Sequence, residues 1–314
     1  MILISLIYFI YFLIMTLYTH QSRNIWKTWI LMSVFFVVII GLGWWASYYF
    51  QNPNILYFFV FFSIFMNILS YWFSDKIVLK MSGARPASRD EFFDLYTVTE
   101  NLAITAGLPL PKIYVINDPA PNAFATGRNK GHAVVAVTTG LLQILNRTEL
   151  EGVIAHELSH VGNRDMLLST IVVVLVGFVS IVSNMFMRSM FWGGGRRNDR
   201  EGGNQIQAVL MIVGVIFTIL SPIIATLIQL SISRKREFLA DATGALLTRY
   251  PEGLASALEK IGKYSQPMVR ANDATAHLFI ANPFGSKAFH GMHKMFMTHP
   301  PIEDRIKALR GSIK

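Results

Sequence analysis

Long apolar stretches alternate with polar regions along the 314 residues of the chain. Four runs contain no Asp, Glu, Lys or Arg: residues 1–22, 28–74, 166–187 and 204–233. About 20 apolar residues of helix cross a bilayer's hydrocarbon core, and the second run is long enough for two helices separated by the turn signal Gln51-Asn52-Pro53-Asn54. The pattern predicts about five transmembrane helices: Ile2–Tyr18, Thr28–Phe50, Ile55–Phe73, Met166–Met187 and Ile206–Leu230.

Composition supports a membrane protein. Apolar residues make up 53% of the chain and charged residues only 15%, against roughly 25% charged residues in a typical globular domain. An alternative stays open for the last two apolar segments, because they could dip into the membrane without crossing it.

Lys and Arg residues indicate the orientation. With five spans and the amino terminus outside, 24 of the 28 Lys and Arg residues lie in the inside segments, as the positive-inside rule requires. We therefore expect a multi-pass protein of the cell membrane whose polar regions face the cytoplasm. The net charge of +9 then reflects contact with the lipid bilayer, and no nucleic-acid partner is expected. The lack of cysteine excludes disulfides, thiolate metal ligands and a cysteine nucleophile.

The two polar regions must supply the chemistry. The first is expected to hold a helix over Asp90–Ala106, followed by three strands: Lys112–Ile116, Ala123–Gly127 and Ala133–Thr138. A helix then begins at the capping-box spacing of Thr148 and Glu151 and runs to about Gly162. The second polar region continues the last apolar helix to Leu247 and closes with a short helix over Glu303–Arg310.

These patterns divide the chain into four parts. We expect an N-terminal transmembrane region of three helices (1–74), the first part of an α+β domain (75–165), a transmembrane hairpin with a polar loop (166–232), and the second part of the domain (233–314).

The string His156-Glu157-Leu158-Ser159-His160 carries the strongest chemical signal. Positions i and i+4 of a helix share one face, so both imidazoles can reach one Zn²⁺ ion, which keeps an open position for water in catalytic sites. Glu157 would lie beside that water as its general base. The alternative, a chance match on an ordinary helix, is expected in fewer than about one chain in a hundred.

A catalytic zinc takes a third protein ligand. The pattern H-E-x-x-H-x-x-G-x-x-H is excluded, because Asn163 and Met166 stand where it needs glycine and histidine. Other histidines and acidic residues remain candidates. Glu237 and Asp241 lie four residues apart on one helix face, where Glu237 could bind the metal and Asp241 could accept a hydrogen bond from a ligand histidine. A solvated charged face is the alternative.

Four motifs together resemble the HtpX family of bacterial membrane metalloproteases, which are relatives of the CAAX prenyl protease. They are the H-E-x-x-H string with Val161 after it, Asn122–Gly127, Arg236–Asp241 and Thr298–Pro301. The resemblance implies an α-helical membrane protein with an α+β zincin-like metalloprotease domain and one zinc ion. It also implies that Glu237 is the third ligand, supported by Asp241, in a cytoplasmic site that acts in quality control of membrane proteins.

Three further residues are candidates for contact with substrate or oxyanion. Asn122 borders a predicted edge strand, where extended substrates add as a further strand, although an Asn-capped turn is an equal alternative. The resemblance suggests that His299 and Arg305 face the cleft and stabilise tetrahedral charge. For Arg305 the alternative is a surface charge on the last helix.

The function expected from these features is zinc-dependent endopeptidase activity on protein substrates, chiefly misfolded or damaged membrane proteins. Two alternatives remain. One is a processing peptidase for a specific lipidated or signalling precursor. The other is a non-catalytic membrane adaptor stabilised by zinc, against which Glu157 argues because a structural site needs no base.

Overall fold

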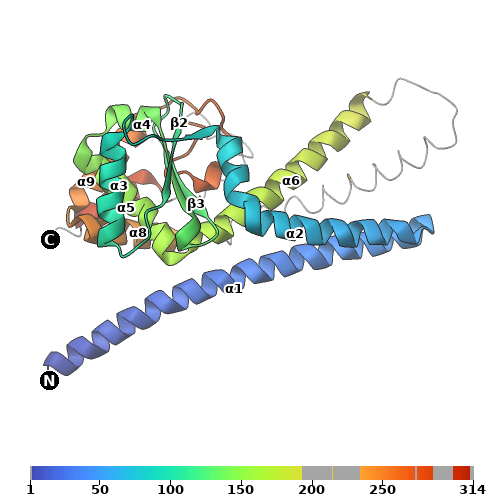
Figure 1. Cartoon of the computed structure of the whole chain (residues 1–314), viewed down its shortest axis with the longest axis horizontal. Helices are drawn as coiled ribbons and strands as arrows, with labels where there is room; N and C mark the ends of the chain where they lie inside the picture. The colour runs from blue at the N-terminus through green and yellow to red at the C-terminus, as the bar shows by residue number, and fades with distance from the viewer. Residues whose placement is uncertain (1, 193–213, 215–233, 273, 286–299, 312–314) are drawn as a thin grey trace.

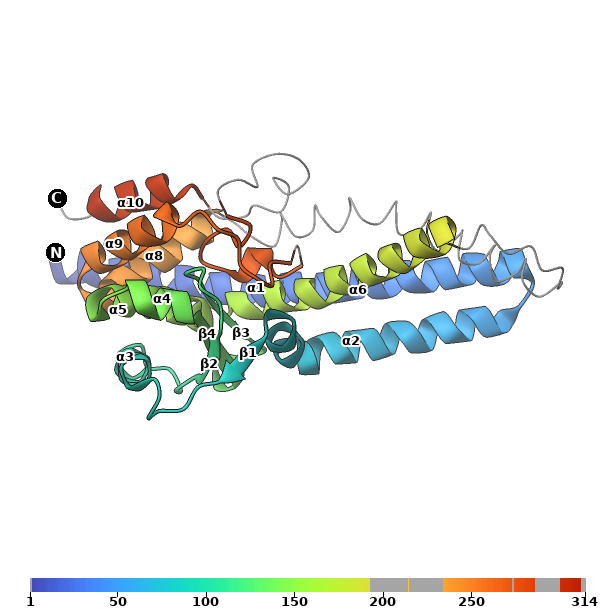
Figure 2. The same ribbon diagram turned by 90° about the horizontal axis from the view of Figure 1, so that it is seen from above.

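The structure, a computed structural model, describes residues 2–192, 214, 234–272, 274–285 and 300–311. Three long helices accompany a smaller unit built of a sheet and short helices: two extend from it and the third passes beneath it in the view of Figure 1. They are α1 (Ile2–Phe50), α2 (Pro53–Ser82) and α6 (Asp165–Trp192). Seen from above, α2 and α6 run away from the smaller unit, and the second half of α1 runs beside them (Figure 2). Each of the three helices contacts the other two.

The turn between α1 and α2 lies where the sequence predicts it. Gln51 has a left-handed φ of 50°, and the side chain of Asn52 accepts a hydrogen bond of 3.1 Å from the N–H of Asn54. Pro53 follows at the start of α2, a position where its missing N–H leaves no helical bond unmade. The turn chemistry of this segment therefore sets the hairpin.

The predicted interruption between the first two spans is wrong, because α1 continues through residues 19–27. Neither glycine nor proline occurs in the first 40 residues, so nothing there stops a helix. With 49 residues, α1 is about 70 Å long at 1.5 Å per residue, more than twice the hydrocarbon thickness of about 30 Å. It therefore extends beyond the bilayer.

Short helices surround the sheet. They are α3 (Phe93–Thr105), α4 (Thr139–Ile144), α5 (Arg147–Asn163), α8 (Arg234–Thr248), α9 (Pro251–Lys263) and α10 (Ile302–Gly311), with 3₁₀ turns at Lys130–His132 and Ala276–Leu278. The expected helix that carries the H-E-x-x-H string and the expected short helix at the carboxyl end are thus confirmed.

Two helical segments among the described residues are long and apolar enough to cross a membrane, Asn24–Phe50 of α1 and Pro53–Ser82. The count rises to three if α5 and the first half of α6, bent by 87° at the break between them, form one span. This is fewer than the five predicted. The predicted span Ile206–Leu230 and the loop before it lie outside the described residues, Gly214 excepted. Helix α2 also continues past residue 75, where the first part of the α+β domain was expected to begin.

A mixed four-stranded sheet lies at the centre of the smaller unit. Its strands are β1 (Ala84–Pro86), β2 (Lys112–Ile116), β3 (Ala123–Gly127) and β4 (Ala133–Thr138), in the spatial order β1-β2-β4-β3. Strands β2 and β4 are parallel and the other pairs antiparallel. The last three strands confirm the prediction, whereas β1 is too short to show a strand pattern. Strand β3 is at an edge, so one side of its backbone faces away from the sheet.

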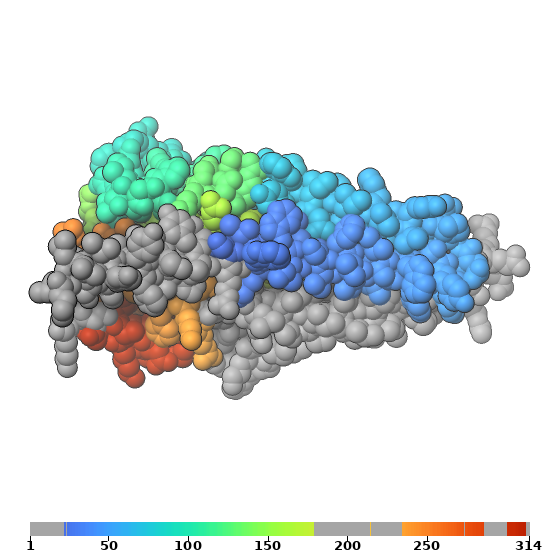
Figure 3. All heavy atoms as spheres, turned by 90° about the horizontal axis from the view of Figure 1, so that it is seen from below, coloured from blue at the N-terminus to red at the C-terminus, as the bar shows by residue number. Residues whose placement is uncertain are grey.

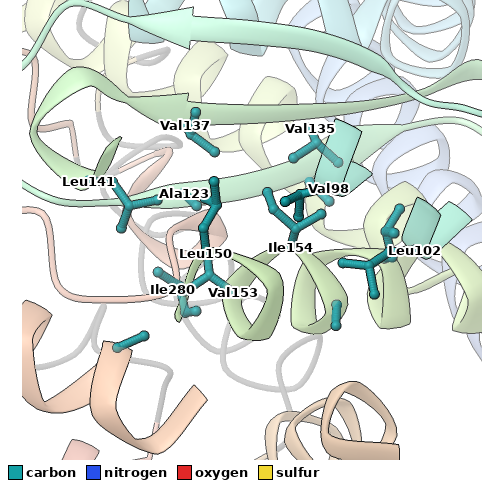
Figure 4. Close-up of a cluster of buried hydrophobic side chains, with 14 of the residues drawn as sticks. Val98, Leu102, Ala123, Val135, Val137, Leu141, Leu150, Val153, Ile154 and Ile280 are labelled. Carbon is teal, nitrogen blue, oxygen red and sulfur yellow. The ribbon is translucent and has the colours of Figure 1, made fainter. Parts of the chain in front are cut away.

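Helix α5 packs between the sheet on one side and α8 and α9 on the other. Figure 4 shows its side chains Leu150, Val153 and Ile154 in one apolar cluster with Val135 and Val137 of β4. Each of these five residues is at most 5% exposed. The helix that carries the H-E-x-x-H string is therefore part of the rigid core.

The start of α5 corrects the predicted capping box. Asn146 caps the helix by accepting a hydrogen bond from the N–H of Glu149 (2.9 Å), and the Glu149 carboxylate accepts one from the N–H of Asn146 (2.8 Å). The predicted box of Thr148 and Glu151 is thus displaced by two residues. Tertiary packing selects the earlier box, because Glu149 also pairs with Lys260 of α9 at 2.7 Å.

Candidate active site

Helix α5 places the two histidines of the string one turn apart. The Nε2 atoms of His156 and His160 are 3.2 Å from each other, and the two rings lie nearly perpendicular. His156 is 1% exposed, whereas 16% of the His160 side chain is exposed. The helix ends three residues beyond His160, where Arg164 takes a left-handed φ of 57°. Both rings are therefore held on a capped, buried helix.

Helix α8 brings Glu237 against these rings. A Cβ atom on Gly244 would lie 3.0 Å from the backbone nitrogen of His156, so glycine lets the two helices approach this closely without a shift of either backbone. The Glu237 carboxylate oxygens lie 3.7 Å from Nε2 of His156 and 3.7 Å from Nε2 of His160. The three side chains that the sequence suggested as ligands thus converge on one point.

The spacing of these donor atoms fits a tetrahedral metal ion. Ligands at 2.0–2.1 Å from zinc lie about 3.3 Å from one another in a tetrahedron. One ligand atom from each of His156, His160 and Glu237 falls within 4.8 Å of the other two. This donor set, two imidazoles and one carboxylate, is one that catalytic zinc sites use.

Asp241 and Arg305 support His156 from behind. The carboxylate of Asp241 lies 2.9 Å from Nδ1 of His156, and Arg305 donates to its two oxygens at 2.8 and 2.7 Å. Arg305 also donates to the carbonyl of Ile280 at 3.0 Å. This side chain is fully buried, which excludes the alternative of a surface charge. Burial raises the pKa of the Asp241 carboxyl, but Arg305 outweighs it and holds this pKa at about 2.

His160 has a second carboxylate partner that sequence reasoning missed. Oδ2 of Asp165, the first residue of α6, lies 3.3 Å from Nδ1 of His160. Burial lowers the pKa of His160, but Glu237 and Asp165 outweigh it and raise this pKa to about 9, so metal binding would release a proton from this ring. The only sequence signal was an aspartate five residues after His160, and the helix break between them brings it back to the ring.

Glu157 lies beside the two histidines and next to the edge strand. It is 2% exposed, and the backbone N–H of Ala125 in β3 donates a hydrogen bond to it. Burial raises the pKa of its carboxyl to about 7, the range in which a general base works best at neutral pH. Burial lowers the pKa of His156 to about 4, which keeps that ring neutral and able to bind a metal.

Two predicted residues remain, Asn122 and His299, and the structure describes the first of them. The side-chain amide of Asn122 donates to the carbonyl of Ala281 (3.0 Å), and its oxygen accepts from the N–H of Ala281 (3.2 Å). Asn122 is thus engaged with the segment that follows the Ala276–Leu278 turn. His299 lies outside the described residues.

Comparison with known proteins defines the class first. The family model described as peptidase family M48 matches residues 90–313 of the chain, which include every residue of the site. The two helices able to cross a membrane precede this region, so the chain is a membrane-associated peptidase.

Individual relatives narrow this further. A protease HtpX homolog of Caldanaerobacter subterraneus is 47% identical over 296 residues, which cover 94% of this chain and 97% of that protein. One of Pyrococcus furiosus is 48% identical over 286 residues, 90% of this chain and 94% of that protein. The crystal structure of S. mikatae Ste24p matches with a TM-score of 0.47 and 19% identity, over 93% of this chain and 66% of that one. The chain belongs to peptidase family M48 and, within it, to the HtpX proteases; it is a membrane metalloprotease.

Proposed function

We propose that the chain is a zinc endopeptidase in which His156, His160 and Glu237 hold the ion and Glu157 is the general base. One observation carries the proposal: the three ligand atoms converge within 4.8 Å while the buried Glu157 lies next to the edge strand β3. A non-catalytic zinc site would have no use for a glutamate of raised pKa beside the ligands.

The residues of the site perform the proton transfers of hydrolysis. Zinc, when bound, polarises the scissile carbonyl and lowers the pKa of water. Glu157 takes the proton from the attacking water and passes it to the leaving nitrogen. Asp241 holds the His156 ring in place, and Arg305 fixes Asp241, so Arg305 acts as a positioning residue. A direct role of His299 on the oxyanion stays a prediction.

Substrate is proposed to bind as an added strand along β3. Pairing with β4 uses the backbone groups of alternate residues, since the N–H of Thr138 donates to the carbonyl of Asn122. The backbone N–H and C=O groups of Ala123 and Ala125 point away from β4. On that side, the Ala123 carbonyl already accepts a hydrogen bond from the N–H of Ile280 at 2.9 Å. A peptide would therefore pair beyond this contact, toward Gly127. We infer that Asn122, through its hydrogen bonds to Ala281, positions the segment that limits how far along β3 a peptide can pair.

The substrates we propose are misfolded or damaged membrane proteins, cut at segments exposed to the cytoplasm. A defined lipidated or signalling precursor is the second candidate. Comparing the membrane proteomes of cells that carry wild-type enzyme or Glu157→Gln separates the two. Many stabilised proteins support a role in quality control, whereas a single stabilised precursor supports processing.

The decisive experiment compares Glu157→Gln with Glu237→Ala in purified full-length protein. Glu157→Gln keeps the shape of the base but removes its basicity, so zinc content should be unchanged while peptidase activity falls by about a hundred- to ten-thousand-fold. Glu237→Ala removes an anionic ligand and should lose zinc. Glu151→Gln, on the same helix but partly exposed, is the matched control and should resemble wild type. Loss of metal in Glu157→Gln, with metal and activity retained in Glu237→Ala, would overturn the assignment.

Orientation can be tested because the chain has no cysteine. We propose that the site faces the cytoplasm of a cell membrane, as the distribution of Lys and Arg indicates. A cysteine at the exposed position Ser88 should be shielded from an impermeant thiol reagent in intact cells, and one at Gly194 should react. Labelling of Ser88→Cys from outside contradicts the orientation.

A further inference from the structure

A buried polar contact joins the membrane helix α1 to the start of α6. Asn24, 5% exposed, is the first residue of the apolar segment Asn24–Phe50. Its side-chain amide donates to Oδ1 of Asp165 at 2.6 Å and lies 3.4 Å from the carbonyl oxygen of Asn163. The N–H donor of a membrane helix is thus directed at a carboxylate 141 residues later in the chain.

The same carboxylate reaches the candidate metal centre. While Oδ1 of Asp165 faces Asn24, its Oδ2 lies 3.3 Å from Nδ1 of His160. Arg236 of α8 approaches from a third side, with Nη1 3.4 Å from Oδ1 of Asp165 and 3.4 Å from Oδ1 of Asn24. Asn24, Asp165 and Arg236 are at most 12% exposed. Three elements distant in sequence therefore meet behind His160.

We propose that Asn24 is a positioning residue for the metal ligand His160, acting through Asp165. The inference rests on the proposed function, in which His160 binds zinc. A carboxylate that receives a hydrogen bond from a ligand histidine fixes the rotation and tautomer of the ring, and loss of such a partner weakens metal binding. The amide of Asn24 holds Asp165 in the rotamer that faces the ring. Without this donor, the contact that Oδ1 of Asp165 keeps among the described residues is the long one to Arg236 (3.4 Å).

The position of the contact gives it a consequence for the whole protein. Asn24 is where the span of α1 begins, so the packing of the membrane helix and the geometry of the metal site depend on the same hydrogen bonds. A zinc site completed in this way forms fully only when α1 is seated against α6.

Helix α1 supplies a matched control one turn away. Thr28 is 2% exposed, and its hydroxyl donates to the carbonyl of Asn24 within the same helix at 2.9 Å. Thr28→Val keeps the shape and removes one buried hydrogen bond of α1 without touching Asp165. It reports any general effect of disturbing this part of the helix.

The test measures zinc affinity by competition with a chromogenic chelator, and records the visible spectrum of the Co²⁺-substituted protein, using the full-length chain in detergent. Asp165→Asn should weaken zinc binding by about 10- to 100-fold. Asn24→Leu should also weaken zinc binding, though less than Asp165→Asn, and should alter the Co²⁺ spectrum. If Asn24→Leu does not fold, Asn24→Ala takes its place. Thr28→Val should match wild type in both measurements.

The double variant Asn24→Leu/Asp165→Asn separates positioning from general destabilisation. If Asn24 acts through Asp165, the double variant binds zinc no more weakly than Asp165→Asn alone. The inference is overturned if zinc affinity is unchanged in both Asn24 variants. It is also overturned if Asn24→Leu lowers zinc affinity as much in the Asp165→Asn protein as in the wild type. His160→Ala is measured in parallel: if it leaves zinc affinity unchanged, the proposed function itself fails, a result distinct from failure of Asn24 alone.

Discussion

The membrane helix α2 and the H-E-x-x-H helix α5 bury different sets of side chains. Four of the seven buried residues of α2 are serines, at positions 63, 70, 74 and 82, while Phe61 and Trp72 point outward with 70% and 52% of their surfaces exposed. Helix α5 instead buries large apolar side chains such as Val153 and Ile154, together with the charged or ionisable His156 and Glu157. Figure 3 shows α1 and α2 forming one continuous surface beside the protease unit.

The difference follows from the solvent each region meets. In water, burying apolar area drives packing. In lipid the surroundings are as apolar as the side chains, so helices associate through small residues that permit close contact. Two of these serine hydroxyls are satisfied within α2 itself: Ser63 donates to the carbonyl of Val60 (2.8 Å) and Ser70 to that of Met66 (2.7 Å). Buried charge, by contrast, is concentrated behind the proposed metal ligands of the protease unit.

The largest expected effect on stability comes from breaking that buried charge. Arg305→Met leaves Asp241 charged, buried and without its guanidinium, so the free energy of unfolding should fall by about 3–5 kcal/mol. Arg310→Met, on the same helix α10 but 45% exposed in its pairs with Glu252 and Glu259, should change stability far less, because water screens exposed ion pairs. Pulse proteolysis of the purified variants measures both values. Equal losses would show that burial does not distinguish the two arginines.

A smaller effect should distinguish the two faces of α2. Ser70→Leu inserts bulk into a fully buried position and should cost about 1–3 kcal/mol through overpacking. Phe61→Leu changes an exposed apolar side chain and should stay within about 0.5 kcal/mol of wild type. Thermal unfolding in the same detergent compares them. A greater loss for Phe61→Leu would mean that this face contacts protein, not lipid.

The smallest effect is the pH dependence that the cap of α5 contributes. Burial raises the pKa of Glu149, but hydrogen bonds from Lys260, Ser256 and Asn146 outweigh it and lower this pKa below its usual value of 4.5. A depressed folded pKa contributes stability that is present above the unfolded pKa and is lost as pH falls through the folded one. As the pH falls from 6 through the folded pKa of Glu149, the Glu149→Gln variant should therefore lose less stability than the wild type. Parallel unfolding curves for the two proteins would contradict this.

Local patterns were sufficient for much of the molecule. The α1–α2 turn at Pro53, the strands β2, β3 and β4, and the helical H-E-x-x-H string could all be predicted, since turn residues and side-chain periodicity act over a few neighbours. Glu237 and Asp241 were identified by resemblance and by their spacing of one helical turn. The displaced cap at Asn146 shows the limit of such reasoning, because two overlapping boxes are locally equivalent and α9 decides between them.

The sequence by itself determined which segments are apolar enough for a membrane and which string could bind a metal, because both depend on the chemistry of adjacent residues. Only the tertiary structure decided which side chains lie behind each proposed ligand. Asp241 pairs with Arg305, which lies 64 residues later in the chain, and Asp165 pairs with Asn24, which lies 141 residues earlier. Neither pairing leaves a local pattern. A buried carboxylate needs a partner in a low-dielectric interior, but which partner it finds depends on how the helices pack.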